Sequence, residues 1–159
     1  MNAAFYVRLR SGFERLLEAI VMVLLLALAT IVVLGVLYRK LGASLVWYDE
    51  VASILLAWIT YYGAALAALK GAHIGVSAVV DAMPARLRRV AIVFAEGCII
   101  GFFLLLAWVG WSVIVILGDD YLVSLPGVST RYVQSVIPIG ALLFVIAELV
   151  RLPELLRPR

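Results

Sequence analysis

The chain has 159 residues, of which 66% are hydrophobic and 14% are charged, whereas soluble domains are about half apolar and about a quarter charged. A soluble domain of roughly 150 residues buries only about 70% of its unfolded surface, so this much apolar surface requires lipid. The net charge of +3 is spread in short clusters, which gives no support to nucleic-acid binding. With one cysteine and one histidine, a disulfide framework and a multi-histidine metal site are excluded, and we expect no cofactor.

Four apolar segments are long enough, or nearly so, to cross a bilayer, because a spanning helix needs about 20 apolar residues. They are residues 19–37, 51–69, 90–117 and 133–150. The first is too long for the apolar core of a signal peptide, and no small-residue cleavage site follows it. The third would measure about 42 Å as one helix, so it should tilt or extend beyond the bilayer. The sequence therefore predicts an all-α membrane protein, a single four-span domain over residues 1–159.

Two further stretches have the spacing of helices that lie at the membrane surface. Residues 5–18 alternate apolar and charged side chains and are a candidate lead-in to the first span. In the loop after the second span, apolar residues recur at i, i+3, i+4 and i+7 from Val76 to Met83. We expect a short interfacial helix there, the alternative being a loop with chance spacing. A basic cluster suited to anionic lipid headgroups follows, at Arg86, Arg88 and Arg89.

The positive charges predict the orientation. Ten of the 13 lysines and arginines lie before the first span, between the second and third spans, or after the fourth. The other two loops hold only three, which places both termini in the cytoplasm of a bacterial cell, with the protein in the inner membrane. Aromatic residues that suit the headgroup region flank the spans on the opposite side, at Trp47, Tyr48, Tyr121 and Tyr132.

Glu96 is the sharpest candidate for a proton or ion relay, because a carboxylate inside a bilayer is costly and so is a functional hypothesis by default. It lies only about 9 Å along a helix from the start of its span, where the preceding arginines could pair with it. Structural pairing, docking to a partner and a coupling role therefore all stay open, with structural pairing favoured. Glu148 precedes Arg151 by three residues, so we expect it at the interface, stabilised by that arginine.

The lone histidine, His73, follows Lys70 and Gly71 in a glycine-containing turn. A catalytic base would need a nucleophile and an acid within hydrogen-bonding reach, and Ser77 and Asp81 are the only close polar residues. A hydrogen bond that fixes the turn is the favoured reading over catalysis.

The other candidates suggest helix contacts. Asp49 and Glu50 suit the dipole at the start of a helix, mid-span aromatic residues need polar partners in lipid, and a Gly-x-x-x-Gly pattern lets helices approach closely. Pro138 should kink the fourth span and free a carbonyl one turn earlier. The candidate partner-contact or structural residues are Trp47, Glu50, Trp58, Tyr61, Tyr62, Gly63, Lys70, His73, Glu96, Gly97, Gly101 and Pro138.

Several runs carry a family resemblance: Trp-Tyr-Asp-Glu at 47–50, Trp58, Gly-Ala-Ala at 63–65, Lys-Gly-Ala-His-Ile-Gly-Val at 70–76, Arg-Tyr at 131–132 and Ile-Pro-Ile-Gly at 137–140. Together they resemble the small, DctQ-like membrane subunit of tripartite ATP-independent periplasmic (TRAP) transporters. The resemblance covers most of the chain from about residue 39 to residue 150 and is most specific in the second span and the turn after it.

The resemblance implies a scaffold subunit rather than an enzyme. In this family a large multi-span membrane subunit carries the substrate and sodium sites and moves as an elevator, and a periplasmic solute-binding protein delivers the solute, usually an organic acid. The alternative is an autonomous small four-helix transporter, proton-coupled through Glu96. A membrane enzyme is a third possibility with little support in the sequence.

The charge distribution predicts that residues 38–50 and 118–132 face the periplasm and that both termini face the cytoplasm. Single cysteines introduced in a Cys98→Ser background should react with an impermeant thiol reagent from outside only in those two loops. Labelling from outside at Ala72 or Arg159 would contradict the predicted orientation.

Overall fold

The computed structural model describes residues 3–72 and 83–155, and these two stretches contain helices and no strand. The helices are α1 (Ala3–Lys40), α2 (Tyr48–Lys70), α4 (Ala85–Ile116), α5 (Thr130–Gln134) and α6 (Val136–Leu155). Within the described residues, α1, α2, α4 and the α5–α6 pair provide four segments that are long and apolar enough to cross a membrane. The predicted all-α, four-span architecture is confirmed. The predicted interfacial helix falls almost entirely on residues 73–82, outside the described residues.

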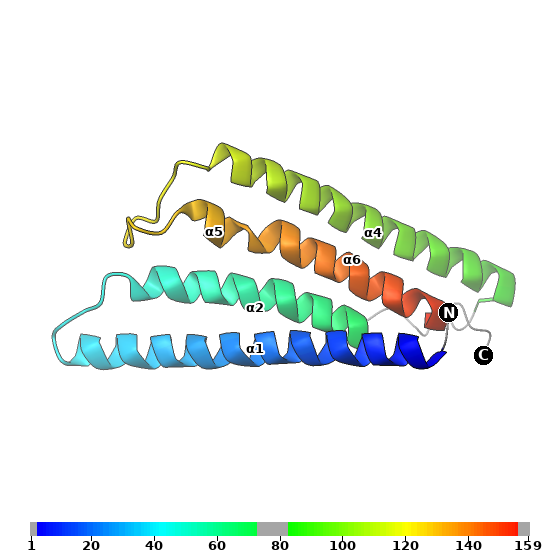
Figure 1. Ribbon diagram of the computed structural model, residues 1–159, viewed down its shortest axis with the longest axis horizontal. Coiled ribbons are helices and arrows are strands. Elements are labelled where there is room, and N and C mark those ends of the chain that lie inside the picture. Colours follow the sequence, from blue (N-terminus) through cyan, green and yellow to red (C-terminus); the bar gives the residue numbers. More distant parts are fainter. Residues whose placement is uncertain (1–2, 73–82, 156–159) are drawn as a thin grey trace.

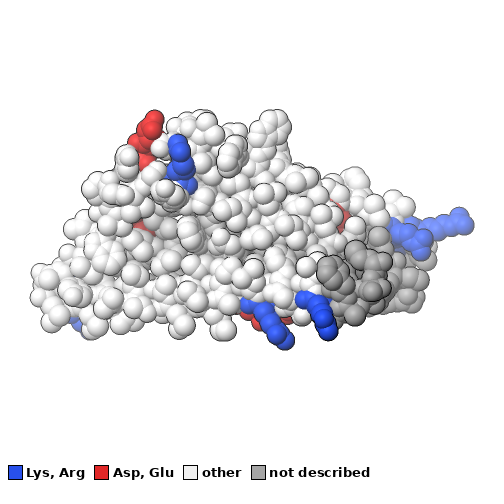
Figure 2. Space-filling model, viewed as in Figure 1, with Lys and Arg blue, Asp and Glu red and all other residues white. Residues whose placement is uncertain are grey.

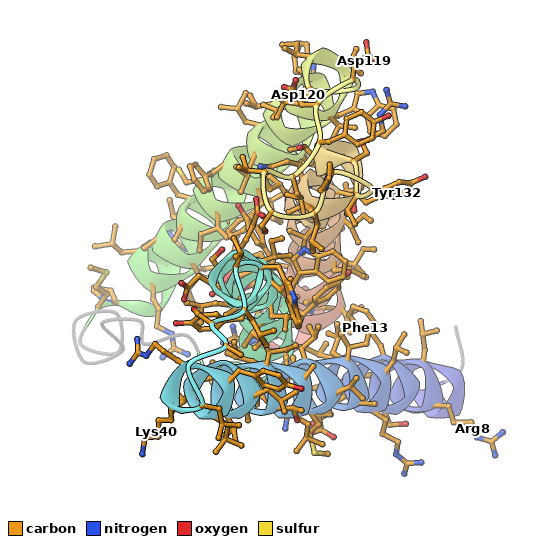
Figure 3. The ribbon with its side chains drawn as sticks, turned by 90° about the vertical axis from the view of Figure 1, so that its left-hand side faces the viewer. Arg8, Phe13, Lys40, Asp119, Asp120 and Tyr132 are labelled. Carbon is orange, nitrogen blue, oxygen red and sulfur yellow. The ribbon has the colours of Figure 1, made fainter. Side chains whose placement is uncertain are left out.

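The helices form a row in which α2 packs against α1 and α6, and α6 packs against α4. Figure 1 shows that α1 begins and α6 ends at one end of the molecule, called here the terminal end. The α1–α2 and α4–α5 connections lie at the opposite end, the loop end. Figure 3 shows α1, with Arg8 and Lys40 near its two ends, crossing beneath the other helices rather than closing a compact bundle.

The open row exposes an unusually large surface. The chain has 10728 Å² of accessible surface, whereas a folded soluble protein of this mass has about 7,900 Å². Much of the exposed area comes from large apolar side chains, such as Leu26, Phe94 and Trp108. Figure 2 shows a face that is uncharged over most of its length. Lipid or a partner in the membrane must cover this surface, because water would not tolerate it.

A small core lies where α1, α2, α4 and α6 meet. Its buried members are Leu17, Ala65, Ala68, Leu69, Phe144 and Ala147. The alanines of α2 let the neighbouring helices approach closely. Phe103 of α4 stacks on Phe144 of α6, with ring centroids 3.7 Å apart and planes 8° from parallel. Phe13 of α1 points toward the same core.

Two of the predicted elements have different boundaries in the structure. Residues 5–18 are not a separate lead-in, because they continue into the first span as part of the 38-residue helix α1. The fourth span is divided at Ser135 into α5 and α6. Pro138 has no N–H to donate to the carbonyl of Gln134, four residues earlier, so the helix is interrupted about one turn before the proline. The Ser135 hydroxyl donates to the carbonyl of Tyr132 at 2.7 Å.

The closest approach between α2 and α6 occurs at Gly140. A Cβ atom at this position would lie 2.7 Å from the Cβ atom of Tyr61. Real Cβ atoms essentially never come so close, and the Cβ atom of Tyr61 is fixed to its helix. Only glycine therefore allows α2 and α6 to lie at this separation.

We expect Gly140→Ala to lower the free energy of unfolding by about 1–3 kcal/mol, the usual cost of overpacking a close contact. The matched control is Gly97→Ala, because a Cβ atom at Gly97 meets nothing within 4 Å, and alanine favours a helix more than glycine does. Reversible unfolding of the full chain in mixed detergent would measure both variants. An equal effect of the two substitutions would contradict the close contact.

Candidate functional site

Most of the candidate residues lie on α2 or directly at its ends. Trp47 precedes the helix, Lys70 ends it, and five others lie between them, namely Glu50, Trp58, Tyr61, Tyr62 and Gly63. Glu96, Gly97 and Gly101 lie on α4, and Pro138 lies on α6. His73 is outside the described residues. The structure does not gather the described candidates into one pocket, but distributes them along the contacts that α2 makes.

At the loop end, Glu50 binds the connection between α4 and α5. Its carboxylate accepts hydrogen bonds from the backbone N–H of Val123 at 3.3 Å and of Ser124 at 2.9 Å. The Ser124 hydroxyl also donates to the same carboxylate. We call Glu50, Val123 and Ser124 the loop-end contact. The sequence suggested the helix dipole for Glu50 and left a contact role open, but nothing in it pointed to Ser124, which is 74 positions away.

The connection that Glu50 binds is compact. The N–H of Leu122 donates to the carbonyl of Val128 at 3.0 Å, and an isolated antiparallel bridge joins Tyr121 to Ser129. Figure 3 shows Asp119 and Asp120 at its start, pointing away from the helices. Glu50 thus fixes an ordered turn against the start of α2.

At mid-depth, two aromatic residues of α2 contact the α5–α6 segment. The indole N–H of Trp58 donates to the carbonyl of Val133 at 3.1 Å. Tyr61 packs on Gly140. The indole N–H therefore finds its acceptor within the chain, and Trp58 and Tyr61 hold the row of helices together.

Tyr62 and Trp58 also line an open groove between α1 and α2. The groove has a volume of about 370 Å³ and is otherwise lined by Ala19, Ile20, Val23 and Leu24. No acid, base or thiol is among these residues, so the groove offers nothing for catalysis. Among the residues that the structure describes, no group of three or more His, Cys, Asp or Glu could hold a metal ion.

At the terminal end, α2 is joined to α1 by charged groups. The ammonium group of Lys70 lies 2.5 Å from a carboxylate oxygen of Glu18 and 3.6 Å from one of Glu14. Arg10 donates to the carbonyl of Leu69 at 3.3 Å, one of the carbonyls left free at the end of α2. We call Arg10, Glu14, Glu18, Leu69 and Lys70 the terminal-end contact.

A left-handed glycine then ends α2. Gly71 has a φ of 69°, and its N–H donates to the carbonyl of Ala68 at 3.0 Å, while the N–H of Ala72 donates to that of Ala67 at 2.9 Å. These bonds form a Schellman motif. A Cβ atom at Gly71 would lie only 3.0 Å from the Nε atom of Arg151. Conformation and space both favour glycine here, which explains the Lys-Gly pair in the sequence.

Arg151 also reaches Glu148, which is buried among the helices. The side chain of Glu148 has almost no exposure, with 1% of the residue accessible. A guanidinium nitrogen of Arg151 lies 3.8 Å from its carboxylate. The predicted pairing with Arg151 is confirmed, and the position of Glu148 at the membrane interface stays a prediction. Glu96 of α4 lies beside Glu148 within hydrogen-bonding range.

The small residues singled out on the open sides make no close helix contacts within the described residues. A Cβ atom at Gly63, Gly97 or Gly101 would meet nothing within 4 Å. The span glycines that do allow close approach are Gly35 of α1 against Tyr48, Gly110 of α4 against Ile137 and Pro138, and Gly140 of α6 against Tyr61. The Gly-x-x-x-Gly pattern of α4 therefore faces outward, toward lipid or a partner.

The sequence matches a known protein family over most of its length. The family model for the DctQ component of tripartite ATP-independent periplasmic transporters matches residues 28–157. The chain belongs to this family. The match includes all of α2, α4, α5 and α6, and so all three residues of the loop-end contact. The predicted resemblance is confirmed.

Two curated TRAP proteins are similar to the chain. It is 45% identical over 75 residues to the ectoine TRAP transporter small permease protein TeaB of Halomonas elongata, a match of 46% of this chain and 39% of that protein. It is 25% identical over 113 residues to the C4-dicarboxylate TRAP transporter small permease protein DctQ of Vibrio cholerae, a match of 70% of this chain and 49% of that protein. The aligned parts thus cover less than half the length of either relative. Membership in a permease family agrees with the prediction that the chain is not an enzyme.

We expect Glu50→Gln to release the α4–α5 connection, because the amide has one acceptor oxygen and no charge to hold three donors. Hydrogen exchange at the backbone N–H groups of Val123 and Ser124 should become faster. Asp49→Asn is the matched control, since Asp49 is exposed and adjacent in sequence, and it should leave both rates unchanged. Unchanged exchange in Glu50→Gln would show that the connection is held by other contacts.

Proposed function

We propose that this TRAP small subunit is a scaffold that supports a large membrane subunit in ion-driven uptake of an organic-acid-type solute. The observation that carries the proposal is the use of polar groups on α2. Glu50, Trp58 and Lys70 each bond to another segment of this chain. A helix that uses these polar groups for internal contacts holds a fixed arrangement, as a scaffold requires.

The solute and its ion pathway belong, in this proposal, to the large subunit, and a periplasmic solute-binding protein delivers the solute. The names of the two relatives support this division. One small permease protein is named for ectoine and the other for C4-dicarboxylates. Because small subunits of one family serve different solutes, they are better explained as structural supports of the transporter than as the subunits that select the solute.

The docking face proposed for the large subunit is the open side of α2 around Gly63. Lipid is as apolar as a leucine side chain, so membrane helices associate through close packing and polar contacts. Gly63 has space above it for another backbone. Gly97 and Gly101 of α4 provide a second open strip, which is the next candidate.

The proposed orientation has both termini in the cytoplasm and the loop end in the periplasm. Arg86 and Arg89 are exposed in the first turns of α4, which would place them at the cytoplasmic headgroups. Clustered basic side chains at that depth suit anionic lipids. The autonomous transporter coupled through Glu96 is not favoured, because the chain belongs to a family of subunits named as one component of a tripartite system.

Reconstitution in liposomes tests the scaffold role. We expect no solute uptake by the purified chain under a sodium or a proton gradient. Uptake should appear only when the large subunit and the binding protein are added. Uptake by the chain alone, lost in Glu96→Gln, would instead establish the autonomous transporter.

The same preparation tests the docking face with two matched variants. A Cβ atom meets no neighbour at either Gly63 or Gly97, so Gly63→Leu and Gly97→Leu should both fold and insert. We expect Gly63→Leu to lose the large subunit in a pull-down and to abolish uptake, and Gly97→Leu to retain both. The reverse result would move the docking face to α4.

A further inference from the structure

We propose that Glu96 and Glu148 form a carboxyl pair that holds one shared proton inside the interface between α4 and α6. The pair lies toward the terminal end, where Arg151 follows Glu148 by one turn. This site does not depend on the scaffold role, because the chain alone contains every group involved. Its failure would leave the proposed function standing.

The carboxyl group of Glu148 and one oxygen of the Glu96 carboxyl group are buried. Glu148 is 1% exposed. One oxygen of each carboxyl group, Oε2 of Glu96 and Oε2 of Glu148, is buried without a hydrogen-bond partner. Unpaired buried charge is expensive, whereas a protonated carboxyl group can be buried at far lower cost. Two ionised groups at this place would therefore destabilise the interface.

A hydrogen bond between the two carboxyl groups requires one proton. The side chains of Glu96 and Glu148 lie within hydrogen-bonding range of each other. An ionised carboxylate only accepts hydrogen bonds, so two ionised groups cannot bond to each other. If one keeps its proton, its O–H donates to the other, and the remaining single negative charge faces Arg151. One proton thus gives the pair both a hydrogen bond and a balanced charge.

The charged groups at the terminal end include Arg151, which contacts Glu148, and Lys70, which pairs with α1. Arg151 is the cation that contacts Glu148, at 3.8 Å. Lys70 at the end of α2 is bonded to Glu18 and lies near Glu14. Apart from the pair and Arg151, the ionisable side chains toward this end of the described structure are Arg8, Arg10, Glu14, Arg15 and Glu18 of α1, Tyr62 and Lys70 of α2, and Arg86, Arg88 and Arg89 of α4.

A bound metal cation fits the site less well than a proton. Sites for hard cations use six or more oxygen ligands. No group of three or more acidic, histidine or cysteine side chains comes together in the part of the chain that the structure describes. A proton needs only the two carboxyl groups.

The shared proton makes the packing of α4 on α6 depend on pH. As pH rises and the proton leaves, two negative charges face each other across the interface, with one arginine beside Glu148 to balance them. The melting temperature (Tm) of the full chain in lipid nanodiscs, followed from about pH 5 to about pH 9, the range in which buried carboxyl groups titrate, should therefore fall by several degrees toward alkaline pH.

Glu96→Gln separates this effect from other titrations. The amide can donate to Glu148, and the one remaining carboxylate is balanced by Arg151. We expect the decrease of Tm with pH to be lost and the alkaline Tm to exceed that of the parent. Asp119→Asn removes the same charge from the exposed α4–α5 connection and should keep the parent's decrease. Equal slopes in Glu96→Gln and the parent would overturn the proposal.

Infrared spectroscopy of the same samples observes the proton directly. The parent should show the carbonyl band of a protonated carboxyl group at neutral pH, and Glu96→Gln and Glu148→Gln should each lose it. A parent without this band would refute the shared proton. So would a Tm that rises with sodium at constant ionic strength in the parent but not in Glu96→Gln, because that result would assign the site to a cation.

Discussion

Helices in a bilayer cannot be held together by hiding apolar side chains from water, since the lipid outside is as apolar as the protein inside. They need close approach of their backbones or polar groups that lipid cannot satisfy. In this chain α2 provides both along its whole length. Glu50 binds the α4–α5 connection, Trp58 and Tyr61 bind the α5–α6 segment, and Lys70 binds α1. These contacts join one helix to α1 on one side and to the α4–α5–α6 segment on the other.

The position of these contacts fits a subunit whose arrangement stays fixed. The charged contacts lie at the two ends of α2, and at mid-depth the indole N–H of Trp58 donates to a backbone carbonyl, that of Val133. Contacts of this kind link helices without creating a polar cavity between them. The outward sides of α2 and α4 keep small residues with open space above them. The chain thus combines a fixed interior with surfaces that another helix could approach.

The four spans could be predicted from the sequence because length and apolar character alone decide whether a segment crosses a bilayer. Contacts between helices could not be predicted, because they depend on rotation and register. Glu50 was noticed and Ser124 was not, since 74 residues separate them. Gly97 and Gly101 matched a packing pattern and yet face outward, whereas Gly140 was the glycine at the close contact. Glu148 was paired with Arg151, three residues later, but its neighbour Glu96 on another helix was not foreseen.

The order of helices in the row also predicts the order in which the helices pack during synthesis. The contacts between α1 and α2, and those between α4 and α6, join segments that follow one another in the chain as hairpins. Within the described residues α2 joins the two hairpins, through its packing on α6 and through the bonds of Glu50 to the α4–α5 connection and of Trp58 to α5. During synthesis the first hairpin can insert and pack before the second leaves the ribosome. The seam lined by Tyr61 and Gly140 is then the last to close, and until it does the newly inserted protein consists of two separate pairs of helices.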